Sequence, residues 1–203
     1  MGFWSSLGSF FSTALSAIVA LPIAEVLLVF QIVKSLLEKL GVIDKEVKED
    51  ELGDKTLQAE EAGIKRENFN TYDEYYKEIQ NFKVDPDKSL KYSDSEKIVA
   101  ATLTLAGLLE EKLGDVKTAF VAEVMPKFGA NLSVERASSY LDSFKDDIAS
   151  VTKYFKGELS DDLRFSVEKQ VVDTEKKLTP EKSGSDILRE IDNVKAAIQG
   201  IVK

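Results

Sequence analysis

Residues 2–40 read GFWSSLGSFFSTALSAIVALPIAEVLLVFQIVKSLLEKL, and this apolar stretch decides which folds the chain can adopt. It carries no charged side chain before Glu25, and the next one is Lys34. An unbroken helix over residues 7–33 would extend roughly 40 Å, which is enough to cross a hydrocarbon core of about 30 Å. We therefore expect a helical segment that is buried in a membrane, in a partner or in the protein's own core.

Two residues interrupt this apolar segment. Pro22 lacks a backbone N–H and clashes with the preceding turn, so it predicts a kink or a division into two helices. Glu25 carries a carboxylate that would cost at least about 2.5 kcal/mol near the centre of a bilayer. We therefore expect Glu25 to face a protein partner or a watery cavity. Gly41 is placed to end the segment as a C-terminal cap.

Small residues recur at every fourth position of the first half of the segment, a spacing that lets another helix approach closely. Bulky aromatic side chains lie on the opposite face, and a tryptophan near the terminus is suited to a membrane interface. The segment therefore predicts a membrane or helix–helix interface. Its candidate residues are Trp4, Gly8, Phe10, Phe11, Ser12, Ser16, Ala20, Pro22 and Glu25.

The composition narrows the classes of function. The 203 residues contain 27 basic and 36 acidic side chains, and residues 1–40 are neutral, so the net charge of −9 belongs to the rest of the chain. A body this acidic disfavours nucleic-acid binding, which needs Lys and Arg at the phosphates. The absence of Cys and His excludes thiol nucleophiles, His bases, typical zinc sites and Ser-His-Asp triads. We therefore expect no catalytic residue, cofactor or metal.

The chain reads as three parts. Residues 1–41 form the apolar anchor or assembly segment, residues 42–70 a charged connector with a short helix at 55–62, and residues 71–203 an acidic helical bundle. We expect no cleavable signal peptide, because the first residues lack Lys and Arg.

The third part shows helical periodicity and helix caps throughout, and no stretch alternates long enough to predict a sheet. The fold class is therefore all-α, with about five to six amphipathic helices behind a long apolar helical segment kinked at Pro22. Residues 95–113 carry the broadest apolar stripe and should be central. The predicted helices are 72–82, 95–113, 115–128, 133–155, 160–178 and one from 185 onward.

Residues 85–96 also resemble a calcium loop in spacing. Asp85, Asp87, Ser89, Ser93 and Glu96 fall at positions 1, 3, 5, 9 and 12 of the template. Leu90 occupies the position that requires Gly, however, and the last two donors also form a capping box. Turn and cap chemistry is the competing interpretation.

These patterns favour a non-enzymatic structural or assembly protein, located at a membrane or within a macromolecular assembly such as a virion, an injection machine or a membrane complex. Its apolar N-terminal helices would contact lipid or other subunits, and it would form a homo- or hetero-oligomer. An alternative function is a helical pore-forming or translocator protein with a releasable apolar hairpin. In a third interpretation, the apolar segment is simply the core of its own bundle.

Overall fold

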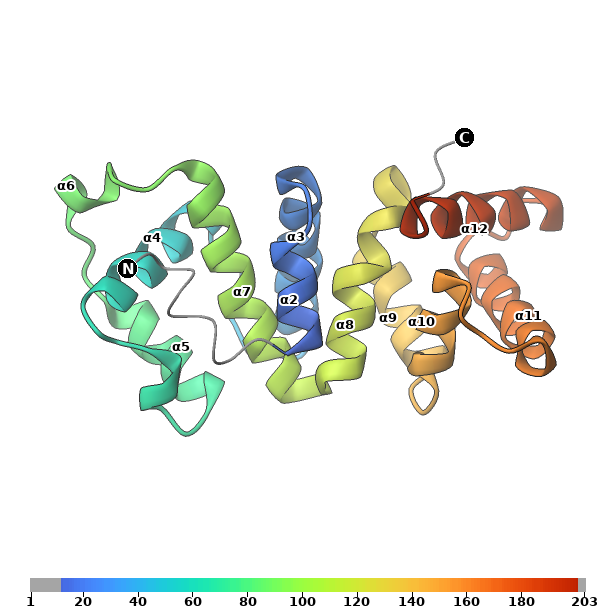
Figure 1. The fold of residues 1–203 in the computed structure, drawn as a ribbon, viewed down its shortest axis with the longest axis horizontal. Helices are drawn as coiled ribbons and strands as arrows, with labels where there is room; N and C mark the ends of the chain where they lie inside the picture. Colours follow the sequence, from blue (N-terminus) through green and yellow to red (C-terminus); the bar gives the residue numbers. More distant parts are fainter. Residues whose placement is uncertain (1–11, 201–203) are drawn as a thin grey trace. The chain divides into compact units, whose positions relative to one another are not determined.

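The computed structural model describes residues 12–200, which fold into helices joined by turns (Figure 1). No β-strand occurs within this range, and the predicted all-α class is confirmed. The chain forms two compact units, Met1–Ala119 and Phe120–Lys203. The boundaries predicted after residues 41 and 70 both fall inside the first unit.

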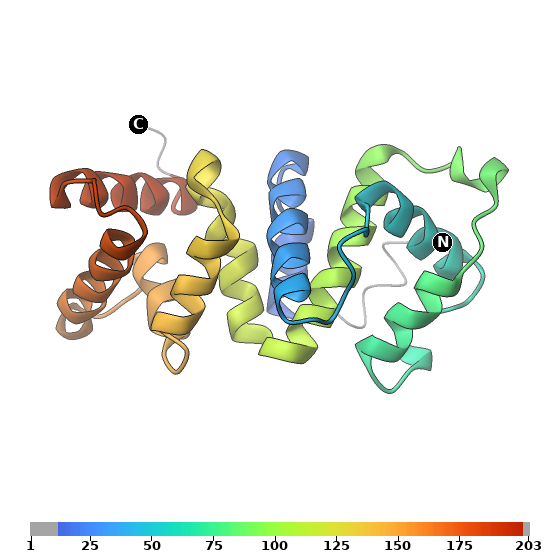
Figure 2. The ribbon, with the colours of Figure 1, turned by 180° about the vertical axis from the view of Figure 1, so that it is seen from behind.

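The first unit is organised around α7, which every larger helix of the unit contacts. Each residue from Ala100 to Leu109 is buried, so this helix is covered on all sides, as its broad apolar stripe predicts. Figures 1 and 2 show α3 beside α7 from opposite directions. The helices of this unit are α2 (Thr13–Val19), α3 (Ile23–Lys39), α4 (Glu49–Glu61), η2 (Arg66–Asn68), α5 (Tyr72–Asn81), α6 (Pro86–Ser89) and α7 (Asp94–Leu113).

Local sequence signals set both ends of α7. The Ser93 hydroxyl accepts from the Glu96 amide, and the Glu96 carboxylate accepts from the Ser93 amide, which completes the expected capping box. Gly114 ends the helix at a φ of 89°, a conformation that glycine adopts without strain.

The apolar segment forms two separate helices, α2 and α3, rather than one kinked helix, within the residues that the structure describes. Both helices contact α7. At the end of α3, Gly41 and Val42 donate to the carbonyls of Glu38 and Leu37. These two bonds form a Schellman motif, and Gly41 is the predicted cap. The buried side chains of α3 are Val26, Val29, Phe30, Ile32, Val33, Leu36 and Leu37.

Burial of the charged segment 49–61 was not predicted. Residues 42–70 read as a solvated connector, yet α4 makes the most extensive helix contact in the chain, against α7. Gly53 explains the close approach, because a Cβ at this position would overlap the backbone of Lys97. Polar side chains of α4, including Asp54 and Glu60, are buried as a result.

The second unit is built around an aromatic cluster. The ring of Tyr140 lies 5.6 Å from that of Phe120, 5.9 Å from Phe128 and 6.1 Å from Phe155, measured between centroids. Such tilted pairs add to the free energy of burial. α8 (Asp115–Glu123) leads into this unit, whose other helices are η3 (Met125–Asn131), α9 (Val134–Ser143), α10 (Ile148–Lys156), α11 (Asp161–Leu178) and α12 (Gly184–Ile198).

Two predicted helices of the second unit are interrupted. The helix predicted at 133–155 breaks into α9 and α10 at residues 144–147, and each piece buries apolar residues of its own. The helix predicted at 115–128 ends at Glu123 and is followed by the 3-10 turn η3, where Pro126 cannot donate to an α-helical bond. Gly157 ends α10 at a φ of 76°.

The start of α11 projects from the unit. Every residue from Asp161 to Ser166 is exposed, including the apolar Leu163 and Phe165. The helix packs through Val167 and Val171 instead.

Candidate interaction surface

Ser12 is the first residue of the predicted interface that the structure describes, and its side chain makes hydrogen bonds within the first unit. Its hydroxyl accepts from the amide of Leu15 at 3.3 Å as the N-cap of α2, and it donates to the Glu110 carboxylate at 2.5 Å. The amide of Ala14 donates to Asp115 at 3.3 Å. Two carboxylates thus satisfy the first turn of α2 and anchor it at the end of α7.

An uncharged, exposed surface surrounds the turn between α2 and α3. We call Ser16, Val19, Ala20, Pro22 and Ile23 the α2–α3 surface, because all five are exposed and adjacent in sequence. Val19 and Ile23 leave 40% and 41% of their surfaces in contact with solvent. The opposite side of α2 packs inward. Three predicted interface residues, Ser16, Ala20 and Pro22, therefore lie together on an accessible face.

Pro22 is the N-cap residue of α3 rather than an interior kink. Its carbonyl accepts from the amides of Glu25 and Val26 at 2.9 and 3.0 Å. A proline at this point loses no helical hydrogen bond of its own.

Glu25 lies in the first turn of α3 and is half-buried. Carboxylates are stabilised there by the unpaired amides of the helix start. The position of Glu25 in the first turn is therefore favourable for its charge. The remaining predicted interface residues, Trp4, Gly8, Phe10 and Phe11, lie outside the residues that the structure describes.

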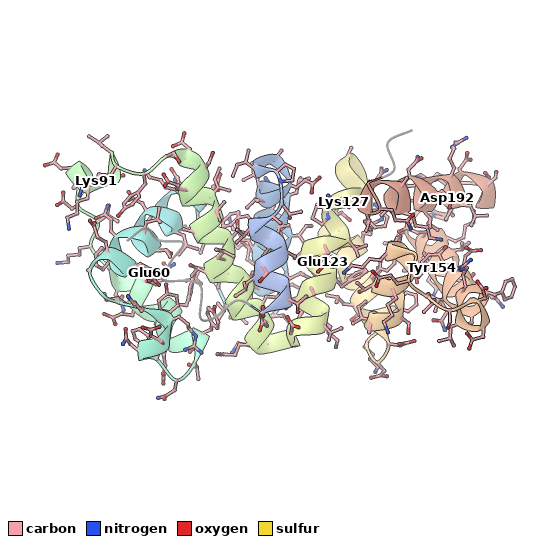
Figure 3. All side chains as sticks on the ribbon, viewed as in Figure 1. Glu60, Lys91, Glu123, Lys127, Tyr154 and Asp192 are labelled. Atoms are coloured by element: carbon pink, nitrogen blue, oxygen red, sulfur yellow. The ribbon has the colours of Figure 1, made fainter. Side chains whose placement is uncertain are left out.

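Buried carboxylates of the first unit hold the segments around α4 together. The Asp54 carboxylate accepts from the side-chain amide of Gln58 at 2.9 Å and from the Ser89 hydroxyl. It also pairs with the Lys97 ammonium at 3.8 Å. Glu60, labelled in Figure 3, accepts from the Tyr75 hydroxyl at 2.8 Å. Burial raises the pKa of Glu60, although the hydrogen bond from Tyr75 opposes this shift.

The second unit contains a closed ionic cluster between α9 and α11. Arg136 donates to Glu175 from Nε at 3.0 Å and from Nη2 at 2.8 Å, and the Tyr140 hydroxyl donates to the same carboxylate at 2.9 Å. Burial lowers the pKa of Arg136, but the Glu175 carboxylate outweighs it and the net shift is upward. The guanidinium also lies over the Phe128 ring, 5.0 Å from its centroid. The cluster joins α9 to α11, and its charged groups are paired with one another.

A second cluster surrounds Lys195 on α12. Its ammonium lies 3.5 Å from the centroid of the Tyr154 ring and 3.9 Å from Glu168, which accepts from the Tyr154 hydroxyl at 2.8 Å. Burial lowers the pKa of Lys195 and raises that of Tyr154. Tyr154 is labelled in Figure 3. Lys195, Tyr154 and Glu168 are thus partners of one another.

The oxygen donors of residues 85–96 are used in caps and local contacts. Asp85 caps α6 by accepting from the Asp87 amide at 3.0 Å, Ser89 donates to Asp54, and Ser93 with Glu96 forms the capping box of α7. Within residues 12–200, no group of three or more His, Cys, Asp or Glu side chains is arranged to hold a metal ion. The turn and cap interpretation accounts for the calcium-like spacing.

The comparisons do not narrow the function. No protein-family model, curated protein or solved structure matches the chain. A search of the helices in residues 12–200 finds none with the length and apolarity needed to span a bilayer.

The sequence analysis missed the residues that create the first unit's core. Gly53 and Gly107 both lie at close approaches, the first against the Lys97 backbone and the second against the Tyr72 ring. A glycine inside a helical stretch is the signal that could have revealed them, because it costs helix stability unless a neighbour needs the space.

Proposed function

We propose that this protein is a non-enzymatic assembly protein that attaches to a membrane or to other subunits through its apolar N-terminal segment. The α2–α3 surface carries the proposal, because it exposes Val19 and Ile23 on a stretch without charge. Residues 2–11, which precede it, are also uncharged and contain four aromatic side chains. In this proposal residues 2–40 act as one apolar segment bent at Pro22, and the acidic remainder faces water.

The arrangement of polar groups supports a binding role over a catalytic one. The acids and bases of the Glu60, Arg136 and Lys195 clusters carry shifted pKa values and are partnered by residues of neighbouring helices. Lys195 and Tyr154 also line a small pocket of about 210 Å³, but both are already paired with Glu168.

The test uses the full chain with charges introduced on the exposed surface. We expect the wild-type protein to float with liposomes, or to form a defined oligomer in light scattering, and the double variant Val19→Glu, Ile23→Glu to lose this behaviour. An isolated charge in hydrocarbon costs about 2.5 kcal/mol or more. Both positions are exposed, so the fold should tolerate the change.

Leu90→Glu is the matched control, because Leu90 is 87% exposed and lies elsewhere in the same unit. The control should float or assemble like the wild type. Unchanged flotation and assembly of the Val19, Ile23 variant would refute the proposal. Ser12→Leu is a poor test, since it also removes a helix cap and the bond to Glu110.

The packing of α3 on α7 favours one alternative function, a pore-forming or translocator protein. A soluble pore-former must cover its apolar helix until it meets lipid, and α7 offers α3 such a cover. The chain has no Cys, so Val29→Cys would provide a single buried thiol on α3 itself. Release of α3 predicts faster thiol labelling and leakage of trapped dye when vesicles are added. If vesicles change neither the rate of thiol labelling nor the retention of trapped dye, this alternative is excluded.

A further inference from the structure

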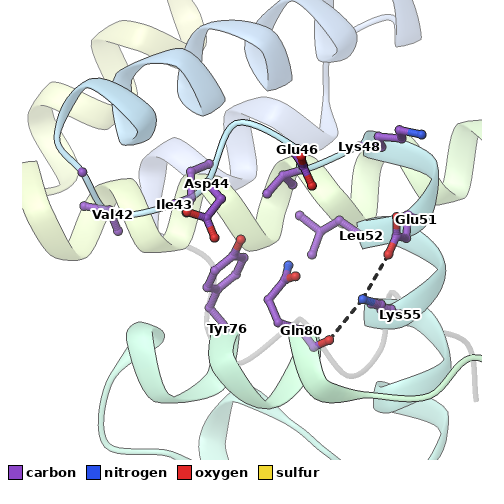
Figure 4. Close-up of a pocket in the computed structure, with 12 residues that line it drawn as sticks. Val42, Ile43, Asp44, Glu46, Lys48, Glu51, Leu52, Lys55, Tyr76 and Gln80 are labelled. Atoms are coloured by element: carbon purple, nitrogen blue, oxygen red, sulfur yellow. Dashed lines mark hydrogen bonds and ion pairs between the residues drawn. The ribbon is translucent and has the colours of Figure 1, made fainter.

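A polar pocket lies between the loop after α3 and the facing sides of α4 and α5, within the first unit (Figure 4). Its volume is about 440 Å³, in the range of small-molecule sites. It is separate from the α2–α3 surface in sequence. Its walls include Asp44 and Glu46 from the loop, Leu52 from α4, and Tyr76 and Gln80 from α5.

Tyr76 is the unusual feature of this pocket. The residue is only 7% exposed, yet its hydroxyl has no hydrogen-bond partner among residues 12–200. In Figure 4 this hydroxyl points into the pocket, toward the Asp44 carboxylate. Burial, followed by the charge of Asp44, raises the pKa of Tyr76 to about 12, so the phenol is neutral at pH 7. The Tyr76 hydroxyl is not among the buried side-chain atoms that lack a partner, so it is open to the pocket, where a ligand can bond to it.

Other polar groups around the cavity are also uncommitted. The Gln80 side-chain amide points into the pocket, and the carboxylates of Asp44 and Glu46 make no ion pair within the described range. Lys55, in contrast, is occupied, because its ammonium pairs with Glu51 at 3.1 Å and donates to the Gln80 carbonyl at 3.1 Å. The lining contains three carboxylates, of Asp44, Glu46 and Glu51, and two ammonium groups, of Lys48 and Lys55. The net charge of the lining is therefore negative.

We propose that this pocket binds an alkylammonium group. An ammonium has three N–H donors and no acceptor, and it would meet the Asp44 carboxylate, the Tyr76 hydroxyl oxygen and the Gln80 amide oxygen. Its alkyl chain would lie against Leu52, whose side chain is one of the apolar parts of the wall (Figure 4). The ligand is either a free amine or a lysine side chain of a partner, since both present the same group. This inference does not depend on the proposed function.

The test titrates the full chain with pentylamine, which is an ammonium at pH 7, and with 1-pentanol as its neutral counterpart. We expect one pentylamine to bind in calorimetry and to shift the NMR signals of the Gln80 side-chain amide. The alcohol should bind about tenfold more weakly, because it lacks the charge-assisted hydrogen bonds. A lysine capped at both ends is the third probe, and it distinguishes a partner's side chain from a free amine.

Asp44→Asn and Tyr76→Phe should each weaken pentylamine binding about fivefold. Asp44 is exposed, so its variant keeps the fold even if the Tyr76 variant does not. Glu78→Gln is the matched control, because Glu78 is an exposed carboxylate on α5 outside the pocket, and it should bind like the wild type. Binding of either amine probe with this variant pattern supports the site. Three results would overturn the proposal: pentylamine and pentanol bind equally well, Asp44→Asn binds pentylamine like the wild type, or neither pentylamine nor the capped lysine binds.

Discussion

Two glycines allow the helices of the first unit to approach closely. Gly53 on α4 faces the backbone of Lys97, which cannot move without shifting α7, whereas Gly107 on α7 faces the Tyr72 ring. A side chain can rotate away from an added methyl group more easily than a backbone can. Gly53 is therefore the stricter of the two requirements.

We predict that Gly53→Ala destabilises the protein by about 1–3 kcal/mol, although alanine in a helix usually gains about 1 kcal/mol over glycine. The overlap with the Lys97 backbone reverses the sign. Urea denaturation measures the effect. Gly184→Ala at the start of α12 is the control, because nothing lies within 4 Å of its Cβ position, and it should be neutral or stabilising. A more stable Gly53→Ala would contradict the close α4–α7 contact.

The buried Glu60 predicts a pH dependence of stability. Its folded-state pKa is raised above 4.5 by burial, so the native state binds more protons than the unfolded chain between the two values. Its contribution to stability therefore falls as the pH rises through this window. Glu60→Gln cannot ionise and still accepts from Tyr75. We expect its stability relative to the wild type to increase from about pH 4 to about pH 7. A pH-independent difference in unfolding free energy would contradict this prediction.

At the scale of helices, an ion pair fixes α9 against α11 in the second unit. Arg136 and Glu175 are only 6% and 3% exposed, so their charges depend on each other for solvation. Removing one partner leaves a buried charge unpaired, whereas removing both does not. The packing of α9 on α11 therefore depends on both charged side chains being present.

A double-mutant cycle tests this coupling. Arg136→Met should cost about 3–5 kcal/mol, and Glu175→Met a comparable amount, because Tyr140 also loses its acceptor. The double variant should be more stable than the sum predicts by at least about 1 kcal/mol. Arg189→Met is the control, since Arg189 pairs with Asp186 on the exposed side of α12 and should have little effect. Additive losses would show that the pair acts as two independent side chains.

At the scale of the whole molecule, charge and apolar character are segregated along the chain. Residues 1–40 are neutral, and the net charge of −9 lies entirely beyond them. A body of this charge repels anionic surfaces over about one Debye length. If the apolar segment attaches to a membrane, lipid charge must therefore influence the attachment.

We predict that the full chain binds zwitterionic vesicles more strongly than vesicles rich in anionic lipid at about 0.01 M salt. The difference should shrink at about 0.15 M salt, where the Debye length falls from about 30 Å to about 8 Å. Flotation at both salt concentrations measures it. A preference for anionic lipid would point to a basic contact surface and would contradict this charge argument.

The sequence alone determined the helical class and many helix ends, because these depend on neighbouring residues. The Ser93 and Glu96 capping box and the Gly41 cap were both placed correctly from local chemistry. Only the tertiary structure decided that the charged helix α4 is buried. That burial depends on the space that Gly53 leaves for the backbone of Lys97, and these two residues are distant in sequence.

The same reason applies to the candidate sites. The sequence identified the uncharged stretch around Pro22, since an absence of charge is visible residue by residue. Which side of α2 remains exposed was decided by α7 and Asp115, which hold its first turn from almost 100 residues away. The pocket beside Tyr76 likewise exists only because α4, α5 and the loop after α3 meet in space. The exposed side of α2 and the pocket beside Tyr76 are both set by long-range packing, which depends on the shape of the side chains as well as on their polarity.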